Sequence, residues 1–479
     1  MNRCFKLFKP IQSHILFLQN KNLATLVERR NPNYAILTDS DFAFFERLLG
    51  KERCVDDTNA LESYNTDWLK MCRGNSKLAI LPKTTSELSE ILKYCHEKNL
   101  AVCPQGGNTG LVGGSVPVYD EIVISTKLMN KIINLDNESS ILSCQSGCIL
   151  QNLDEYIREK AGLTMPLDLG AKGSCHIGGN VSTNAGGLRL LRYGSLKGNI
   201  LGLEVVLSNG EVLNSMNTPV RKDNTGYDLK QLFIGSEGTL GFISGVSILC
   251  PQKPKAANLI LVACDGNSFK TVIEVFKTAR QELNEILSAF EFMDRESMIA
   301  VKENSNLENP FDKEISEKCN FYCLAETHSS DEESAIKKIE NFYSKLSEKG
   351  LGLNGIIAEN KSQFKFLWSL RERIAESLTR DGYNYKYDIS LPINKMYDLV
   401  MDTRKRFKDN NAEKEFRRCI GYGHLGDGNL HLNVTSTTYD DKIFGLLEPF
   451  LFEWTKANNG SISAEHGLGL KKRNYIYYS

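Results

Sequence analysis

Histidines and carboxylates gather in two short segments near the C-terminal end of the chain. His424 and His431 lie within a stretch of eight residues, although the whole chain has only seven histidines. Two glycines between them allow a tight turn, and imidazole nitrogen is a common ligand of divalent transition metals, so both rings can converge on one ion. Further along, Glu465 and His466 place a carboxylate beside a third histidine. These four side chains are therefore candidates for a metal site.

The spacing alone leaves a second interpretation open. Zinc motifs with a defined spacing differ from the one between His424 and His431, and histidines in loops or strands are often held by ordinary hydrogen bonds. The rest of the chain must decide between a metal site and a structural role.

Composition and charge describe a globular protein with more than one domain. The chain has 479 residues, of which 41% are apolar and 24% charged, and this length predicts about two or three domains. A formal net charge of −1 argues against a nucleic-acid partner. Thirteen cysteines without a CxxC pair indicate reduced, mostly buried thiols. The apolar run from Ala256 to Cys264 is far shorter than the roughly 18 residues of a transmembrane helix, so we expect no transmembrane segment.

The N-terminus resembles a targeting segment. The first 27 residues contain Arg3, Lys6, Lys9 and Lys21 but no acidic residue, and apolar residues are interspersed among them. This composition is typical of a mitochondrial transit peptide, and we assign residues 1–30 to it. An ordinary basic tail is the alternative.

Three further regions follow. Residues 31–75 form a polar, helical lead-in. Residues 76–252 alternate short β-branched runs with helical patterns, and the turn signal Asn209-Gly210 lies between two of the predicted strands. After Pro251-Gln252-Lys253-Pro254 the glycines thin out and longer amphipathic helices are expected, for example over 268–287 and 332–349. This change in composition and in the expected helices predicts a second domain over 253–479.

A GxGxxG match at residues 350–355 does not indicate a Rossmann site. The motif follows a predicted helix and precedes a predicted strand, whereas a dinucleotide fingerprint needs a strand before it and a helix after it. We interpret it as the end of a helix and a turn.

Three glycine-rich segments of the first domain are better candidates for a nucleotide site. Residues 105–115 follow a predicted strand, and their glycines expose backbone N–H groups that can bind a pyrophosphate. Residues 170–187 and 235–241 have mostly small side chains, which allow close approach of a large flat ligand. Together the three segments imply a dinucleotide. The candidate cofactor residues in them are Gly106, Gly107, Asn108, Thr109, Gly110, Ser115, Gly178, Gly179, Asn180 and Glu237.

In their order these segments resemble the FAD-binding domain of the vanillyl-alcohol-oxidase-type flavoproteins. The resemblance implies an α+β fold, with a two-part FAD-binding domain followed by an α+β substrate and metal domain. Many members attach the flavin to a histidine of the first loop. This chain has Thr109 there, so the expectation is noncovalent FAD.

The C-terminal half is similar to the mitochondrial D-2-hydroxyglutarate dehydrogenase family, among the type 4 FAD-binding oxidoreductases. The resemblance rests on residues 368–372, 385–392, 423–434 and 463–467. It implies that His424, His431 and Glu465 bind a metal, usually zinc. It also implies that Arg371, Lys386, Asn433 and His466 face the substrate. The expected electron acceptor is an electron-transferring flavoprotein, and the expected location is the mitochondrial matrix.

Physical chemistry supports these roles. A 2-hydroxydicarboxylate brings two anions, which Arg371 and Lys386 can neutralise, although both could also be solvated charges. A dication bound to the substrate hydroxyl lowers its pKa, and His466 as general base can take the proton while hydride passes to FAD. Zinc suits this role, and manganese or cobalt also fit such a site. The predicted reaction is oxidation of D-2-hydroxyglutarate to 2-oxoglutarate.

Two departures from the family bear on this prediction. Relatives commonly have a threonine where this chain has Ala375, so one contact to the substrate carboxylate is expected to be missing. Relatives also continue beyond Ser479 with a further helix and tail, so we expect a shorter form or a fragment. The alternatives are a D-lactate dehydrogenase, a metal-dependent hydrolase with a phosphorylated substrate, and a nucleotide-binding protein without catalysis.

Overall fold

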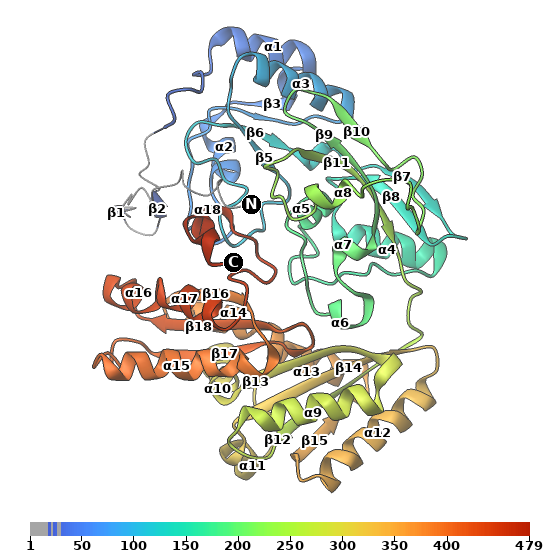
Figure 1. The fold of residues 1–479 in the computed structure, drawn as a ribbon, viewed down its shortest axis with the longest axis vertical. Coiled ribbons are helices and arrows are strands. Elements are labelled where there is room, and N and C mark those ends of the chain that lie inside the picture. Colours follow the sequence, from blue (N-terminus) through green and yellow to red (C-terminus); the bar gives the residue numbers. More distant parts are fainter. Residues whose placement is uncertain (1–17, 21–22, 26–29) are drawn as a thin grey trace, which may run out of the picture.

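The chain folds into two α+β parts that lie one above the other in Figure 1. The structure is a computed structural model that describes residues 18–20, 23–25 and 30–479. The predicted transit segment, residues 1–30, therefore lies for most of its length outside the described residues. Strands β1 (Leu18–Asn20) and β2 (Leu23–Thr25) pair antiparallel.

The N-terminal part contains two sheets. In the first sheet the strand order is β3-β4-β6-β5, and in the second it is β10-β9-β11-β8-β7. The strands are β3 (Cys54–Val55), β4 (Ala79–Ile80), β5 (Val102–Gln105), β6 (Ile122–Ser125), β7 (Ile132–Asp136), β8 (Ile141–Gln145), β9 (Ile200–Val206), β10 (Val212–Asn214) and β11 (Phe242–Leu249). The helices are α1 (Asp39–Leu49), α2 (Thr58–Asn65), α3 (Thr85–Glu97), α4 (Leu150–Ala161), α5 (Ile177–Ser182), α6 (Leu190–Tyr193), α7 (Leu196–Asn199) and α8 (Lys230–Phe233).

The residues before position 76 belong structurally to the first sheet. We expected a helical lead-in there, and α1 and α2 are present, but β3 also pairs antiparallel with β4. Phe45 and Leu49 of α1 are buried in one core with Leu88 and Ile91 of α3. The apolar face of α1 thus completes the core of the first sheet, which a purely polar lead-in would not do.

The short strands expected between residues 76 and 252 are present. The turn predicted at Asn209-Gly210 lies between strands β9 and β10, which pair antiparallel. Gly210 has a φ of +86°, a conformation that favours glycine. Gly107 is the second residue after the end of β5. A Cβ on it would lie 2.1 Å from the carbonyl oxygen of Ser174, so the two glycine-rich segments can pack together only with glycine here.

The C-terminal part is built on one antiparallel seven-stranded sheet with the order β15-β12-β14-β13-β17-β18-β16. The strands are β12 (Ala256–Cys264), β13 (Leu287–Asp294), β14 (Phe321–Ser329), β15 (Gly352–Ile357), β16 (Tyr383–Ser390), β17 (Arg418–His424) and β18 (Asn429–Ser436). The helices are α9 (Phe269–Glu282), α10 (Arg295–Ser305), α11 (Lys313–Lys318), α12 (Glu332–Glu348), α13 (Lys361–Glu372), α14 (Ile374–Thr379), α15 (Met396–Asp409), α16 (Asp441–Leu447), α17 (Phe450–Ala457) and α18 (Gly469–Lys472).

Each face of this sheet has its own hydrophobic core, because side chains alternate along the strands. On β12, Ile260 and Val262 face the core shared with α9, α12 and α15 to α17. Leu259 and Leu261 face the opposite core, shared with α10, α13 and α14. Figure 1 shows α9 and α12 together over β12 and β15. The sheet is therefore covered on both faces.

Two of the longer helices were predicted. Helix α12 agrees with the expectation for 332–349, and β15 follows it, so the GxGxxG match lies between a helix and a strand. The prediction of one helix over 268–287 was wrong at its end. Helix α9 stops at Glu282, a 3-10 turn over Asn284–Ile286 follows, and Leu287 already begins β13. Asn284 has a φ of +31°, which an α-helix cannot continue.

The chain crosses back to the N-terminal part at its C-terminal end. We call residues 463–472 the C-terminal segment; it includes α18, which lies against the N-terminal part in Figure 1. The backbone N–H of Leu470 donates to the carbonyl of Val112 at 2.9 Å, and Lys471 Nζ donates to the carbonyl of Leu111 at 3.0 Å. This segment therefore joins the two parts through the first glycine loop.

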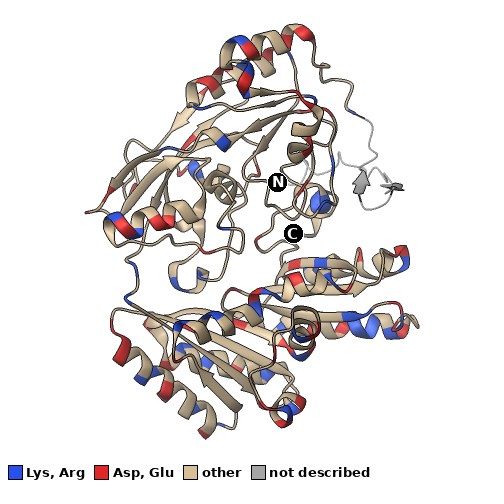
Figure 2. Ribbon diagram, turned by 180° about the vertical axis from the view of Figure 1, so that it is seen from behind, with Lys and Arg blue, Asp and Glu red and all other residues tan. Residues whose placement is uncertain are grey.

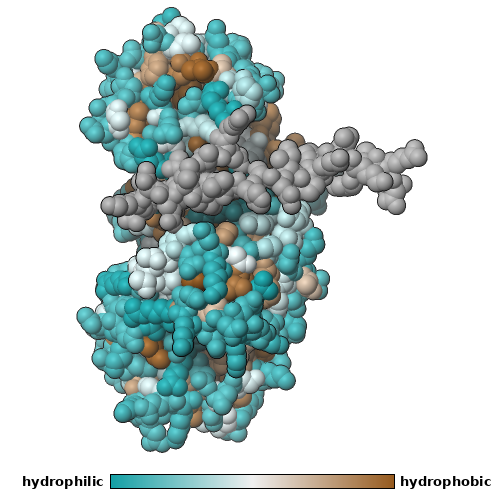
Figure 3. Space-filling view, turned by 90° about the vertical axis from the view of Figure 1, so that its left-hand side faces the viewer, coloured by the Kyte–Doolittle hydropathy of each residue, from teal (hydrophilic) through white to brown (hydrophobic). Residues whose placement is uncertain are grey.

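The surface agrees with the composition. Acidic and basic residues are interspersed over the helices of both parts (Figure 2), and hydrophobic side chains are scattered on the mostly hydrophilic face in Figure 3. Every cysteine from Cys54 to Cys419 is buried and carries a free thiol. Among the described residues, helices long and apolar enough to cross a membrane are absent.

Candidate functional site

The candidate metal ligands lie on one face of the seven-stranded sheet. His424 is the last residue of β17 and His431 lies on β18, opposite Tyr422. Alternate residues of β18, such as Leu430 and Leu432, face the hydrophobic core on the other side of the sheet. The alternating pattern of β18 thus turns its polar residues toward the N-terminal part.

Three imidazoles and one carboxylate converge at this face. His424 Nε2 and His431 Nε2 are 3.3 Å apart, and each is 3.8 Å from Glu465 Oε1. His466 Nε2 lies 3.6 Å from the same oxygen. Ligands of a tetrahedral zinc ion with bonds of about 2.1 Å are roughly 3.4 Å apart. The two histidines and Glu465 therefore fit a zinc ion of that geometry.

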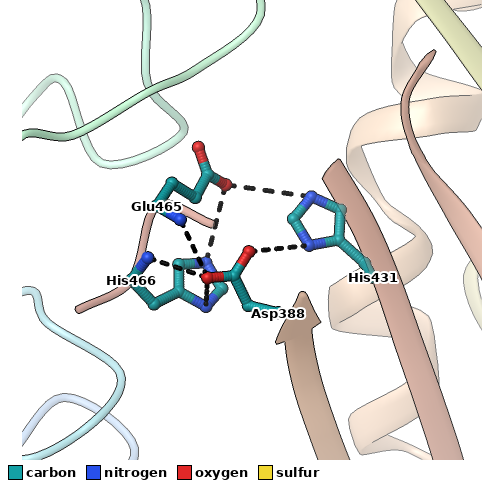
Figure 4. Close-up of side chains that lie close together, drawn as sticks. All are labelled: Asp388, His431, Glu465 and His466. Atoms are coloured by element: carbon teal, nitrogen blue, oxygen red, sulfur yellow. Dashed lines mark hydrogen bonds and ion pairs between the residues drawn. The ribbon is translucent and has the colours of Figure 1, made fainter. Parts of the chain in front are cut away.

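Asp388 lies beside the candidate metal ligands, and both of its carboxylate oxygens accept hydrogen bonds. Its Oδ2 accepts the backbone N–H groups of Ala464, Glu465 and His466 at 2.9–3.1 Å, and its Oδ1 accepts from Asn429 Nδ2 at 2.7 Å. Figure 4 shows Asp388 between the loop and the ring of His431. Asp388 is close enough to His431, Glu465 and His466 to count as a possible ligand. Since its Oδ2 holds the loop and its Oδ1 accepts from Asn429 of β18, we assign it a positioning role.

Glu465 is fixed by the N-terminal part of the molecule. Its Oε2 accepts the backbone N–H of Gly187 at 2.9 Å, which leaves Oε1 turned toward the histidines. The second glycine-rich segment therefore orients a side chain of the candidate metal site.

Electrostatics differ sharply between the histidines. Burial would lower the pKa of His424, but Glu291 and Glu465 outweigh it and raise that pKa to about 10. Burial and the neighbouring His424 hold the pKa of His431 well below its usual range. Burial also lowers the pKa of His466, although Asp388 opposes the shift. Burial would raise the pKa of Glu465, but the hydrogen bond with His424 holds it well below its usual range.

The candidate substrate residues surround this cluster. Arg371 on α13 is buried, its Nε donates to Glu291 at 2.7 Å, and its guanidinium lies 4.7 Å from the centre of the Tyr422 ring. Lys386 lies opposite Asn433 on β16 and β18, and burial lowers its pKa. Within the described part of the chain, the amine of Lys386 forms neither a hydrogen bond nor an ion pair.

Buried polar atoms in the cluster lack partners. Asn433 is fully buried, its Oδ1 accepts from Asn384 at 3.0 Å, and its Nδ2 has no partner among the described residues. The Nδ1 of His431 is likewise unpaired and lies 3.8 Å from Asp388. Because buried donors are almost always satisfied in native proteins, an unpaired amide beside a free amine indicates a polar ligand.

The ten candidate cofactor residues come together in one cleft. It encloses about 880 Å³ of space, partly open to solvent, and His466 of the C-terminal segment also lines it. Cβ atoms built on Gly110 and Gly179 would meet nothing within 4 Å, so the backbone there is open to a ligand. The buried Oδ1 of Asn180 has no partner among the described residues. These features fit a nucleotide whose far end approaches His466.

Three of these ten residues use their side chains structurally. Asn108 Nδ2 donates to the carbonyls of Ser63 and Thr66, and its Oδ1 accepts from the hydroxyl of Ser115 at 2.8 Å. Glu237 accepts the backbone N–H groups of Leu468 and Gly469 at 2.7 and 2.9 Å. Glu237 thus anchors the C-terminal segment to the rim of the cleft. In the same cleft, His176 Nδ1 is 2.8 Å from the hydroxyl of Thr126, a contact that accounts for its burial without a catalytic role.

Sequence reasoning missed several supporting residues. Glu291, Asp388, Tyr422 and Gly187 belong to four different strands and loops, and none lies in a motif with metal-binding spacing. Only Asp388 had a local signal, because Lys386 and Asp388 alternate with apolar neighbours on one strand and must share a face.

Known protein families and curated proteins match both parts of the chain. Residues 76–215 match the family described as "FAD binding domain", and residues 253–479 match "FAD linked oxidases, C-terminal domain". The chain is 55% identical over 446 residues to D-2-hydroxyglutarate dehydrogenase, mitochondrial, of Danio rerio, covering 93% of this chain and 81% of that protein. It is 51% identical to the Arabidopsis thaliana protein of the same name, covering 95% and 79%.

A solved structure supports the fold alone. Alkyldihydroxyacetonephosphate synthase superposes with a TM-score of 0.70 at 16% identity, covering 93% of this chain and 84% of that one. Together these matches confirm the predicted two-part FAD-binding domain followed by an α+β C-terminal domain.

Proposed function

This chain belongs to the D-2-hydroxyglutarate dehydrogenase family of FAD-linked oxidases, and we propose that it catalyses the FAD-dependent oxidation of D-2-hydroxyglutarate to 2-oxoglutarate. The family membership is carried by relatives more than 50% identical over most of the chain. The proposal for the reaction is supported by a cleft suited to FAD that meets buried cations and a histidine cluster at His466.

FAD would be held by the glycine loops around the cleft. The open backbone at Gly110 and Gly179 suits the pyrophosphate, and the unpaired Oδ1 of Asn180 suits a flavin or ribose donor. Thr109 has a weakly nucleophilic hydroxyl where an imidazole would be needed for covalent attachment, and the ring of His176 is engaged with Thr126. We therefore propose noncovalent FAD.

A zinc ion would be held by His424, His431 and Glu465, whose ligand atoms lie 3.3–3.8 Å apart. The mixture of nitrogen and oxygen donors also suits manganese or cobalt. When bound, FAD supplies a hydride acceptor and the metal supplies a Lewis acid for the substrate hydroxyl.

The chain's own residues bind and orient the substrate. Lys386 and the terminal nitrogens of Arg371 offer cations to the two carboxylates, and the unpaired Nδ2 of Asn433 offers a further donor. The Nε2 of His466, beside Glu465 and at the cleft, is positioned to take the hydroxyl proton. Asp388 accepts the backbone N–H of His466, which fixes the main-chain position from which the base extends.

We also propose a location and an electron acceptor. Proteins of the same family are named mitochondrial, and the N-terminal composition of this chain supports a mitochondrial location, which we extend to the matrix. An electron-transferring flavoprotein is the acceptor that we propose.

The convergence of His424, His431 and Glu465 beside the cations Arg371 and Lys386 is the observation that carries the proposal. It is tested by flavin and zinc content in the wild type and in His424→Ala. Removal of one ligand should abolish zinc binding and turnover, while the visible flavin spectrum stays. Wild-type turnover in His424→Ala would refute the metal assignment, and a colourless protein that FAD cannot reconstitute would refute the dehydrogenase.

A departure from the family resemblance favours a second substrate class. The resemblance implies a threonine at the position of Ala375, so the diacid is expected to have one fewer hydroxyl contact here, and D-lactate becomes the competing substrate. Two cations still favour the diacid, because lactate has only one carboxylate for them.

A further inference from the structure

Glu291 connects the candidate metal site to the candidate substrate site. It lies on β13 directly opposite His424 of β17, and its side chain is fully buried. Its Oε1 is 2.6 Å from His424 Nδ1, and its Oε2 accepts from Arg371 Nε at 2.7 Å. One carboxylate therefore holds a metal ligand with one oxygen and a substrate cation with the other.

Each contact with Glu291 leaves free those atoms of His424 and Arg371 that a metal or a substrate would need. Because the carboxylate accepts at Nδ1 of His424, the Nε2 of that ring points toward His431 and Glu465. Only the Nε of Arg371 donates to Glu291. Its two terminal nitrogens have no hydrogen-bond partner among the described residues and are available to a ligand. The Tyr422 ring, 4.7 Å from the guanidinium carbon, restricts the guanidinium further.

We propose that Glu291 is a positioning residue shared by the two sites, so that it fixes His424 for the metal and Arg371 for the substrate carboxylate at the same time. This inference rests on the proposed zinc and diacid sites. Carboxylates that hydrogen-bond a metal-bound histidine orient the ring and raise its basicity. Here the same group also fixes the guanidinium of Arg371, so loss of Glu291 is expected to weaken two binding events rather than one.

Glutamine is the informative substitution. A carboxylate accepts at both oxygens, whereas a glutamine side chain has one accepting end and one donating end of nearly the same shape. In Glu291→Gln, either His424 or Arg371 must therefore face a donor, and the arginine also loses its counter-charge. Neither partner can be satisfied as in the wild type.

The test measures each binding event without the other. Zinc affinity is measured by competition with a chromogenic chelator, with no diacid present. Glutarate, which has two carboxylates and no hydroxyl, is titrated into the metal-free protein by calorimetry. We expect Glu291→Gln to weaken zinc by about 10- to 100-fold, the usual effect of losing such a second partner, and to weaken glutarate by on the order of 10-fold.

Asp381→Asn is the matched control. Asp381 is another buried carboxylate of the same domain, and it accepts from Arg418 Nε and the hydroxyl of Thr435, both at 3.0 Å, away from the histidines. It should lower the melting temperature without moving either affinity. If Glu291→Gln does not fold, Glu291→Asp keeps two acceptors on a shorter stem and should weaken both ligands by smaller factors.

The outcomes separate this inference from the proposed function. Wild-type protein that binds neither zinc nor glutarate contradicts the proposed sites themselves. Wild-type protein that binds both, with a Glu291 variant that stays within twofold for either ligand, contradicts the shared role of Glu291 and leaves the proposed function standing.

Discussion

The surroundings of Lys386 are the clearest indication that the substrate is an anion. Lys386 is a half-buried amine that forms neither a hydrogen bond nor an ion pair with the described residues; burial lowers its pKa, and the nearby charges of Asp388 and Glu465 oppose this shift. Desolvating a cation without a direct partner costs stability, so such a residue is expected to have a ligand that neutralises it. An anionic substrate group next to Asn433 and His466 is the simplest candidate.

Lys386→Met should therefore separate binding from stability. The Michaelis constant for D-2-hydroxyglutarate should rise by about 10- to 100-fold, because a charged hydrogen bond to a carboxylate contributes roughly 1.5–3 kcal/mol. The melting temperature should rise, because the buried charge is removed while the volume is kept. Lys472→Met is the control, since Lys472 Nζ donates to the carbonyls of Asp388 and Ile462 and its loss should destabilise the protein. An unchanged Michaelis constant in Lys386→Met would contradict a substrate role.

Ala375 gives a prediction in the opposite direction. It lies on α14, four residues after Arg371, at a position where the family resemblance implies a threonine, and it is half-buried. Ala375→Thr should lower the Michaelis constant for D-2-hydroxyglutarate by roughly fivefold, as a net hydrogen bond contributes about 1 kcal/mol. Ala375→Val has the same shape without the hydroxyl and should not have this effect. Equal effects of the two substitutions would assign the change to packing.

Single residues also mark the limit of sequence reasoning. His424, His431, Glu465 and His466 were identifiable because each pair is close in sequence. Glu291 was not, since it lies 133 residues from His424 and reaches it only because β13 pairs with β17. A lone glutamate in an apolar strand has no local pattern that distinguishes a positioning residue from an exposed charge.

Among the secondary-structure elements, α6, α13 and β14 meet at a buried network that borders the site. Glu326 of β14 accepts from Arg189, Ser288 and Trp368, and it is 2.9 Å from His328 Nε2. Trp368 lies on α13 three residues before Arg371. The network therefore joins the N-terminal part to the helix that carries a candidate substrate residue.

This network predicts a stability change at acidic pH. Burial would raise the pKa of Glu326, but His328 and Arg189 outweigh it and lower that pKa to about 2 from the usual 4.5. A carboxylate with a lowered folded-state pKa stabilises the protein above its unfolded pKa, and this contribution is lost as the pH falls from about 4.5 toward 2. It amounts to on the order of 3 kcal/mol.

Urea unfolding of the wild type and Glu326→Gln should show this directly. The difference in free energy of unfolding should be largest at pH 6 and should shrink steadily below pH 4.5. A difference that is constant between pH 6 and pH 3 would mean that Glu326 is not ionised in the native protein.

Helices and strands were predicted best where the spacing of apolar residues and the turn-forming residues at their ends indicated the same element. The strands of the N-terminal part and helix α12 follow alternating or helical patterns bounded by glycine, proline or capping residues. The end of α9 was missed because Leu283, Ile286 and Leu287 continue its apolar pattern, although Leu287 already belongs to β13. Strand β3 was missed because two residues are too few to show a period.

In the whole molecule, the two parts are joined through the C-terminal segment at the place where their ligands must meet. Glu237 holds the backbone of this segment from the N-terminal part, Asp388 holds it from the seven-stranded sheet, and Gly187 holds the side chain of Glu465. His466 consequently belongs to both the cleft and the histidine cluster. This arrangement could not be predicted from sequence, because it depends on how separate domains pack.

The central claim is that the buried cations and the histidine cluster select a 2-hydroxydiacid for oxidation by FAD. Anaerobic mixing of the flavin-loaded, zinc-loaded protein with D-2-hydroxyglutarate, followed at the visible flavin absorbance, tests this claim without any assumption about the electron acceptor. We expect D-2-hydroxyglutarate to bleach the flavin absorbance rapidly and D-lactate to bleach it much more slowly at equal concentration. Bleaching by D-lactate but not by D-2-hydroxyglutarate would contradict the central claim.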